Sequence, residues 1–287
     1  MGAALLLSGL ATLWLPAARA QQVAGAADQK PSRINTLIER LEQGGIATTG
    51  RNGVWTFVDM EHSPYDITDL KRQFESFAEK RKPNGQLETT PFVRIPPYGE
   101  DVPNWVVKQV LDAGALGVVF PQVDTKEQTL RAIRAMRYPP QKGAKYPEPV
   151  GIRGWTFRER KMWGPVGGPQ GQQEYLRRAD VWPLNPEGEL AAMIMIESPV
   201  GVKNINEILA VPGITSILIG PADLGLNLGV GLPPTGPNAA YAPEEQAAIE
   251  TVARACAAKK VICGIASGQT PMLTKLGFRV FFGGAAN

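Results

Sequence analysis

The sequence is poor in residues that commonly bind transition metals or form disulfides. Its 287 residues include one histidine, His62, and two cysteines, Cys256 and Cys263. A single histidine excludes a zinc site with two or three histidine ligands. The cysteines are expected on a helix and on the strand that follows it. Such backbones are usually too far apart for a disulfide, so we expect two small buried side chains.

Long runs of one charge are also absent. The chain has 30 Lys and Arg against 27 Asp and Glu, a net charge of +3, with both signs interspersed. Neither a Lys/Arg run nor a basic patch interleaved with aromatic residues is present, so a nucleic-acid partner is not expected. The 44% hydrophobic and 20% charged residues are typical of a globular protein with a full core.

Long hydrophobic runs are limited to the first residues of the chain. Residues 3–15 are nearly all apolar and carry no charge, and Pro16 and the small-residue pattern Ala18-Arg19-Ala20 follow. This pattern predicts a secretory signal peptide over residues 1–20, although no basic residue precedes the apolar run. We therefore expect a periplasmic or secreted protein with no stable membrane span after cleavage. A membrane anchor is the alternative, but the run is shorter than the roughly 20 residues needed to span.

The rest of the sequence divides into a polar leader with a helix, residues 21–45, and a region of alternating strand and helix patterns, residues 46–287. This alternation predicts a parallel sheet with crossover helices, closed as a (β/α)8 TIM barrel. Eight strands are predicted, at residues 46–49, 56–60, 91–95, 117–123, 192–196, 216–219, 261–266 and 280–282. Amphipathic helices are predicted after Asp66 and over residues 105–113, 127–136, 202–209, 244–259 and 270–276.

Two regions depart from this rhythm. Only residues 50–55 separate the first two strands, too few for a crossover helix, so either a neighbouring segment such as 34–41 fills the gap or the first strand is absent. Residues 137–189 are rich in Gly, Pro, Arg and Trp and predict an irregular insertion before strand five. Such a segment is a lid, an oligomer contact or a solvated surface loop. The closing helix expected after the last strand is missing from the sequence.

Catalytic side chains of such a barrel lie at the carboxyl ends of the strands. Glu197 and Asp223 follow consecutive strands, and two carboxylates without further His or Cys describe a site for Mg²⁺ or Mn²⁺, completed by water and by the carboxylate and keto oxygens of a 2-oxo acid. The alternative is that each carboxylate caps a helix or forms an ion pair. Gly220, Pro221 and Ala222 begin a helix whose backbone N–H groups can hold a substrate carboxylate, and Gln122 follows strand four beside them.

The single histidine follows strand two. His62 suits a general base, and Asp59 or Glu61 can orient it. Arg94, at the end of strand three, can stabilise an enolate oxygen, or it can form a salt bridge with Asp59 or Glu61.

These motifs resemble the HpcH/HpaI aldolase/citrate lyase family of metal-dependent pyruvate aldolases. The resemblance runs from about residue 54 to the end of the chain. It is carried by Asp59-x-Glu61-His62, Val93-Arg94, Phe120-Pro121, Arg137-Tyr138-Pro139-Pro140, Gly151-Ile152-Arg153-Gly154, Ile196-Glu197 and Gly220-Pro221-Ala222-Asp223-Leu224. It implies that His62 is the acid/base, that Arg94 binds the 2-oxo group and that Glu197 and Asp223 bind the divalent metal. It also implies that residues 220–222 hold the pyruvate carboxylate and that the protein is a homo-oligomer.

The expected reaction is reversible aldol cleavage of a 4-hydroxy-2-oxo acid to pyruvate and an aldehyde, catalysed by an aldehyde-lyase. Met195 stands where the family often has a glutamine facing the site, and Arg153, on the insertion, is a further candidate for contact with the distal end of the substrate. Two alternatives remain: a citrate-lyase-like or acyl-CoA lyase, with the Arg-rich segment 153–161 as a site for the CoA tail, and an exported 2-oxo-acid-binding barrel without turnover.

Overall fold

The computed structural model describes residues 33–50, 52–97, 104–156, 160–164, 171–233 and 240–282. The predicted signal peptide, residues 1–20, lies outside these ranges. None of the helices in the described ranges is long and apolar enough to cross a membrane.

The described strands form one parallel sheet in the order β1-β9-β8-β7-β6-β4-β3-β2. Their bounds are β1 Ala47–Thr48, β2 Trp55–Asp59, β3 Thr90–Arg94, β4 Gly117–Phe120, β6 Leu190–Ile196, β7 Ser216–Ile219, β8 Ile262–Ile265 and β9 Phe278–Phe281. Each predicted strand is therefore present. The N–H of Val54 donates to the carbonyl of Thr48 at 3.1 Å, next to the two outermost strands, β1 and β2. The sheet is a nearly closed eight-stranded barrel, which confirms the predicted fold.

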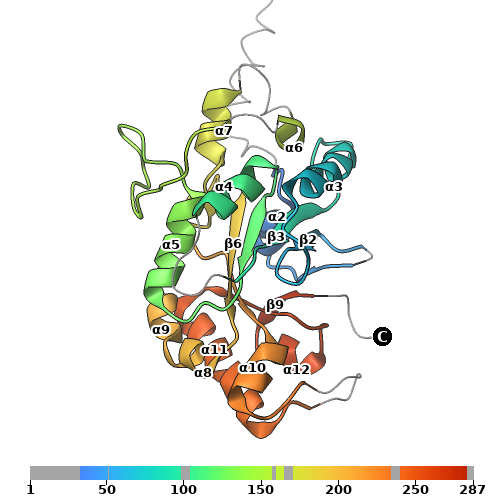
Figure 1. Cartoon of the computed structure of the whole chain (residues 1–287), viewed down its shortest axis with the longest axis vertical. Coiled ribbons are helices and arrows are strands. Elements are labelled where there is room, and N and C mark those ends of the chain that lie inside the picture. The colour runs from blue at the N-terminus through green and yellow to red at the C-terminus, as the bar shows by residue number, and fades with distance from the viewer. Residues whose placement is uncertain are drawn as a thin grey trace, which may run out of the picture. The chain divides into compact units, whose positions relative to one another are not determined.

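Most of the helices lie around the strands, as Figure 1 shows. Their bounds are α3 Ile67–Glu79, α4 Asn104–Asp112, α5 Lys126–Met136, α6 Arg160–Trp163, α7 Gln172–Arg178, α8 Pro199–Lys203, α9 Ile205–Ile208, α10 Pro221–Leu228, α11 Pro243–Lys259 and α12 Pro271–Lys275. The Asp66 side chain accepts from Thr68 and Asp69 N–H, as the predicted cap of α3 requires. The single helix predicted over residues 202–209 is wrong, because Asn204 ends α8 and α9 starts directly after it.

The short first unit is explained by helix α2, Thr36–Glu42, which lies in the segment expected to fill the gap. Its apolar face, Leu37, Ile38 and Leu41, packs with the inward-facing side chains of the strands, among them Trp55 and Phe92. The helix therefore covers the interior of the barrel and is not a crossover helix on its outside. The first strand is present, although it is short.

Helix α2 is held in place by a buried carboxylate at the start of β6. Glu189 accepts from the backbone N–H groups of Ile34 and Asn35, at 3.2 and 2.9 Å, and forms ion pairs with Arg33 and Arg178. Since a buried charge is costly unless it is paired, this set of contacts fixes the helix at the amino-terminal end of the strands.

The insertion 137–189 is more regular than predicted, because it contains α6, α7 and a ninth strand, β5 Val181–Trp182. β5 pairs with the first residues of β6, Val181 opposite Leu190. The described part of the insertion therefore lies at the amino-terminal end of the strands, opposite the place that a lid over the active site would occupy.

The two cysteines are free and buried, as expected.

Candidate active site

The carboxyl ends of β2 and β3 place an arginine beside two acids. Asp59 and Arg94 are paired in the sheet register and both point into the barrel. Arg94 Nε donates to Asp59 Oδ1 at 2.9 Å, and Nη2 pairs with the other carboxylate oxygen. Nη1 lies 2.7 Å from Glu61 Oε2. Arg94 is 9% exposed, so its charge is neutralised mainly by these two acids.

Glu61 lies close to both Arg94 and His62. Its Oε2 lies 3.7 Å from His62 Nε2, whereas Asp59 is occupied by Arg94 and by the N–H of Glu61. Of the two acids predicted to orient the histidine, Glu61 is therefore the neighbour. The His62 side chain is 64% exposed and lies at the rim of the site, where it can meet substrate and water.

Burial raises the pKa of Glu61, and the positive charge of Arg94 opposes the shift. For Asp59, burial acts in the same direction, but the hydrogen bond and charge of Arg94 outweigh it and the pKa is lowered. Asp59 is therefore the permanent counter-charge of the arginine.

Glu197, at the end of β6, is enclosed on two sides. It is 2% exposed, and its Oε2 accepts from the backbone N–H of Gln122 at 2.7 Å. Gln122 has φ +53°, an uncommon conformation for a residue with a side chain. On the other side Gly220 is so close that a Cβ there would lie 2.3 Å from Glu197 Oε1. Glycine is therefore required at position 220 by the approach of the carboxylate.

Asp223 lies in the first turn of α10, whose N-cap is Gly220. Burial raises the pKa of Glu197 to about 7, and the charges of Glu61 and Asp223 act in the same direction against the backbone hydrogen bond from Gln122. The three carboxylates are thus close enough to repel one another. The same first turn presents backbone N–H groups that have no partner inside the helix, which suits an anionic substrate group.

The structure therefore gathers the predicted residues Asp59, Glu61, Arg94, Glu197 and Asp223 at one end of the barrel, with His62, Gln122 and residues 220–222 around them.

Two residues predicted as possible members of the site, Met195 and Arg153, lie outside this group. Met195 points inward but is 1% exposed and packs in the apolar interior below Glu197. Arg153 is at the amino-terminal end of the strands, where its backbone N–H bonds to Arg137, so its predicted contact with the substrate's distal end is wrong.

Two residues that support the site, Phe57 and Asn227, were not identified from the sequence. The Phe57 ring lies under the Arg94 guanidinium, 5.7 Å from centroid to Cζ, and stacks on Phe282. Asn227 Nδ2 donates to the Glu197 carbonyl at 2.8 Å. The signal for Phe57 was available, because it lies two residues before Asp59 and shares its inward face. Asn227 follows Asp223 by one helical turn.

The sequence matches the family model for HpcH/HpaI aldolase/citrate lyase over residues 48–274. It is 34% identical over 226 residues to a hydroxypyruvate/pyruvate aldolase from Delftia acidovorans, covering 77% of this chain and 67% of that protein. A 2-keto-3-deoxy-L-rhamnonate aldolase from Escherichia coli O9:H4 is 33% identical over 208 residues, with 72% and 63% covered. Among other relatives named hydroxypyruvate/pyruvate aldolase, the covered share of the relative ranges from 52% for the protein from Deinococcus radiodurans to 72% for the protein from Roseobacter denitrificans.

Among solved structures, an HpcH/HpaI aldolase/citrate lyase family protein from Burkholderia cenocepacia J2315 superposes with a TM-score of 0.66 at 26% identity, over 88% of this chain and 93% of that one. The family model covers most of the barrel and every strand-end residue of the site. The chain belongs to the HpcH/HpaI aldolase/citrate lyase family.

Proposed function

We propose that the protein is a metal-dependent aldehyde-lyase that cleaves a 4-hydroxy-2-oxo acid reversibly to pyruvate and an aldehyde. The observation that carries the proposal is the joint placement of Arg94, Glu197 and Asp223 at one end of the barrel, with His62 at the rim. The names of the relatives, hydroxypyruvate/pyruvate aldolase and 2-keto-3-deoxy-L-rhamnonate aldolase, support a 2-oxo acid as the substrate class.

The residues fit a hard divalent cation. Four carboxylates, those of Asp59, Glu61, Glu197 and Asp223, lie at this end of the barrel with one buried cation, Arg94, which leaves an excess of negative charge. Within the described ranges no three His, Cys, Asp or Glu side chains form a metal cage by themselves. A two-carboxylate site on Glu197 and Asp223 needs oxygens from water and substrate, which is the coordination that Mg²⁺ and Mn²⁺ favour. When bound, the ion supplies a Lewis acid for the 2-oxo group.

Backbone groups and side chains of the site carry out the remaining steps of the reaction. Backbone N–H groups at the start of α10 hold the substrate carboxylate. His62, directly or through a water, takes the proton from the C4 hydroxyl as the C3–C4 bond breaks and the aldehyde leaves. Arginine has five N–H donors. Arg94 uses Nε and Nη2 for Asp59, and Nη1 lies beside Glu61, so N–H groups on the terminal nitrogens are left for the enolate oxygen. Protonation of the enolate carbon then gives pyruvate.

The acyl-CoA lyase alternative rested on the Arg-rich segment 153–161, of which residues 157–159 lie outside the described ranges. The Arg-rich segment begins at Arg153, which lies at the end of the barrel opposite the site.

The test is pyruvate release from a 4-hydroxy-2-oxo acid in the presence of Mn²⁺ or Mg²⁺. EDTA should abolish the activity and either metal should restore it. His62→Ala should lower kcat by about 10²- to 10⁴-fold, the usual contribution of a general base, while the exposed Glu127→Gln should leave it unchanged. Pyruvate release that withstands both EDTA and His62→Ala would refute the mechanism. Metal-dependent binding of pyruvate or oxalate, without turnover of any aldol substrate, would instead identify a binding protein.

Export and homo-oligomerisation are two further parts of the proposal. The apolar segment 3–15 followed by Ala18-Arg19-Ala20 supports cleavage after Ala20. A mature protein that begins at Gln21 in the culture medium or periplasm is expected, and retention of the full chain in the cytoplasm would refute export. Light scattering of the mature protein tests the oligomer, which a monomeric mass would rule out.

A further inference from the structure

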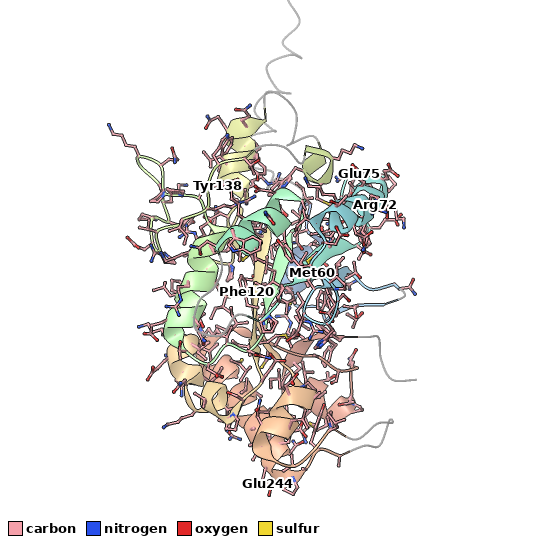
Figure 2. The ribbon with its side chains drawn as sticks, in the orientation of Figure 1. Met60, Arg72, Glu75, Phe120, Tyr138 and Glu244 are labelled. Carbon is pink, nitrogen blue, oxygen red and sulfur yellow. The ribbon has the colours of Figure 1, made fainter. Side chains whose placement is uncertain are left out.

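A cavity lies in the insertion, at the end of the barrel opposite the candidate active site. It has a volume of about 450 Å³ and is lined by Tyr138, Arg153, Trp155 and α7 residues such as Gln173. A neighbouring cavity of about 480 Å³ shares Tyr138 and Gln173 with it. Figure 2 shows Tyr138 near α7, well apart from Met60, which follows β2 at the active-site end.

Arg153 is the unusual residue of this cavity. Its side chain is 1% exposed, and Nη2 bonds to Asp112 at 2.9 Å and to the Tyr175 hydroxyl at 3.2 Å. The Nε and Nη1 nitrogens are buried and have no hydrogen-bond partner in the described part of the chain. An unpaired buried donor of a charged group costs free energy, and such a group in a native protein calls for an explanation. A ligand that accepts from Nη1 provides one for that nitrogen.

The surroundings define the chemistry of that ligand. The Tyr138 ring lies over the guanidinium at 4.7 Å, and the Trp155 ring is 5.5 Å from Tyr138. Asp112 also pairs with Lys108, so two cations share one acid and the local charge is positive. A carboxylate oxygen matches the unpaired Nη1 donor, and a flat apolar body matches the rings.

We propose that this cavity is a second binding site, which takes a small organic carboxylate with a flat, unsaturated body. Trp155, which is 52% exposed, lines the same cavity as Arg153, so a carboxylate on Nη1 of Arg153 would lie beside the indole ring. The site lies at the amino-terminal end of the strands, so its ligand is bound independently of the aldol substrate. The proposal does not depend on the proposed aldolase activity.

The test uses the full chain with benzoate as the probe and its neutral analogue benzamide for comparison. Binding is followed by calorimetry and by the indole N–H resonance that Trp155→Ala removes. Arg153→Lys keeps the charge opposite Asp112 but removes the Nη1 donor, and Trp155→Ala changes an exposed side chain and leaves the core intact. Trp105→Ala is the matched control, because Trp105 is 58% exposed on a different helix, α4.

Benzoate is expected to shift the Trp155 resonance saturably, and benzamide to bind about tenfold or more weakly, the usual effect of losing a charged hydrogen bond. Arg153→Lys and Trp155→Ala should each weaken benzoate binding by a similar factor, and Trp105→Ala should not change it. Oxalate with Mn²⁺, which resembles a 2-oxo acid, should not compete. Equal binding of benzoate and benzamide, unchanged binding in both cavity variants, or competition by oxalate would overturn the proposal.

Discussion

Gly220 offers the most direct test of the site geometry, because it is a glycine for reasons of space alone. Its φ of −97° is accessible to alanine, so Gly220→Ala introduces no backbone strain. The added Cβ would lie 2.3 Å from Glu197 Oε1 and 2.8 Å from Cδ. Ordinary contacts begin near 3.4 Å, so the carboxylate must move by about 1 Å. The Gln122 N–H at 2.7 Å and the 2% exposure of Glu197 leave it little room to do so.

A displacement of this size is expected to weaken Mn²⁺ binding by about 10- to 100-fold, as changes beside a metal ligand commonly do, and to lower kcat by about 10²-fold. Mn²⁺ titration of pyruvate release measures both, and a thermal melt shows whether the fold is kept. Gly154→Ala is the matched control, since its Cβ meets only the flexible end of Lys108, at 3.2 Å. If Gly220→Ala bound Mn²⁺ as tightly as the unchanged protein, Glu197 would not be a metal ligand in this position.

Two further changes test other parts of the structure. The lowered pKa of Asp59 means that its pairing with Arg94 stabilises the fold above the ordinary aspartate pKa of about 3.9, and that this stability is lost as the pH falls through the lower folded value. Urea unfolding at a series of acidic pH values should therefore depend less on pH in Asp59→Asn, and an unchanged pH profile would contradict the ion pair. Leu37→Ala should cost about 2–5 kcal/mol of unfolding free energy, because Leu37 on α2 is fully buried in the barrel interior. The exposed Arg40→Ala on the same helix should cost far less in the same urea titration, and equal losses would mean that α2 does not fill the barrel.

The strands could be predicted because each is a short apolar run with a clear turn on either side. Predicted ends differ from the structure by up to three residues, as for residues 117–123 against Gly117–Phe120. β5 was missed, because two residues in a segment without periodicity carry no signal of their own and pair only where β6 is already in place. The break at Asn204 was missed for a similar reason, since Ile205 and Ile208 continue the apolar spacing of a single helix.

The residues of the site could be predicted from the ends of the strands, but the contacts between their side chains could not. The rule that catalytic residues follow the strands gathered Arg94, Asp59 and Glu197 correctly. It could not show that Arg94 pairs with Asp59 and Glu61 at once, because a salt bridge to either acid fits the same positions in the sequence. It also misplaced Arg153, because a residue of a long insertion can return to either end of a barrel.

The inward-facing rows of the strands explain why charge gathers at one end only. On β6 the inward residues Ala191, Met193 and Met195 are apolar and buried, and the next residue on that face is Glu197. On β2 the row passes from Trp55 through Phe57 to the acid that pairs with Arg94. The charged layer therefore rests on an apolar floor that excludes water from one side. Because electrostatic interactions strengthen as water is removed, this floor increases the attraction of the site for a cation and for a developing enolate. Met195 belongs to that floor, so a methionine at this position is compatible with a working metal site directly above it.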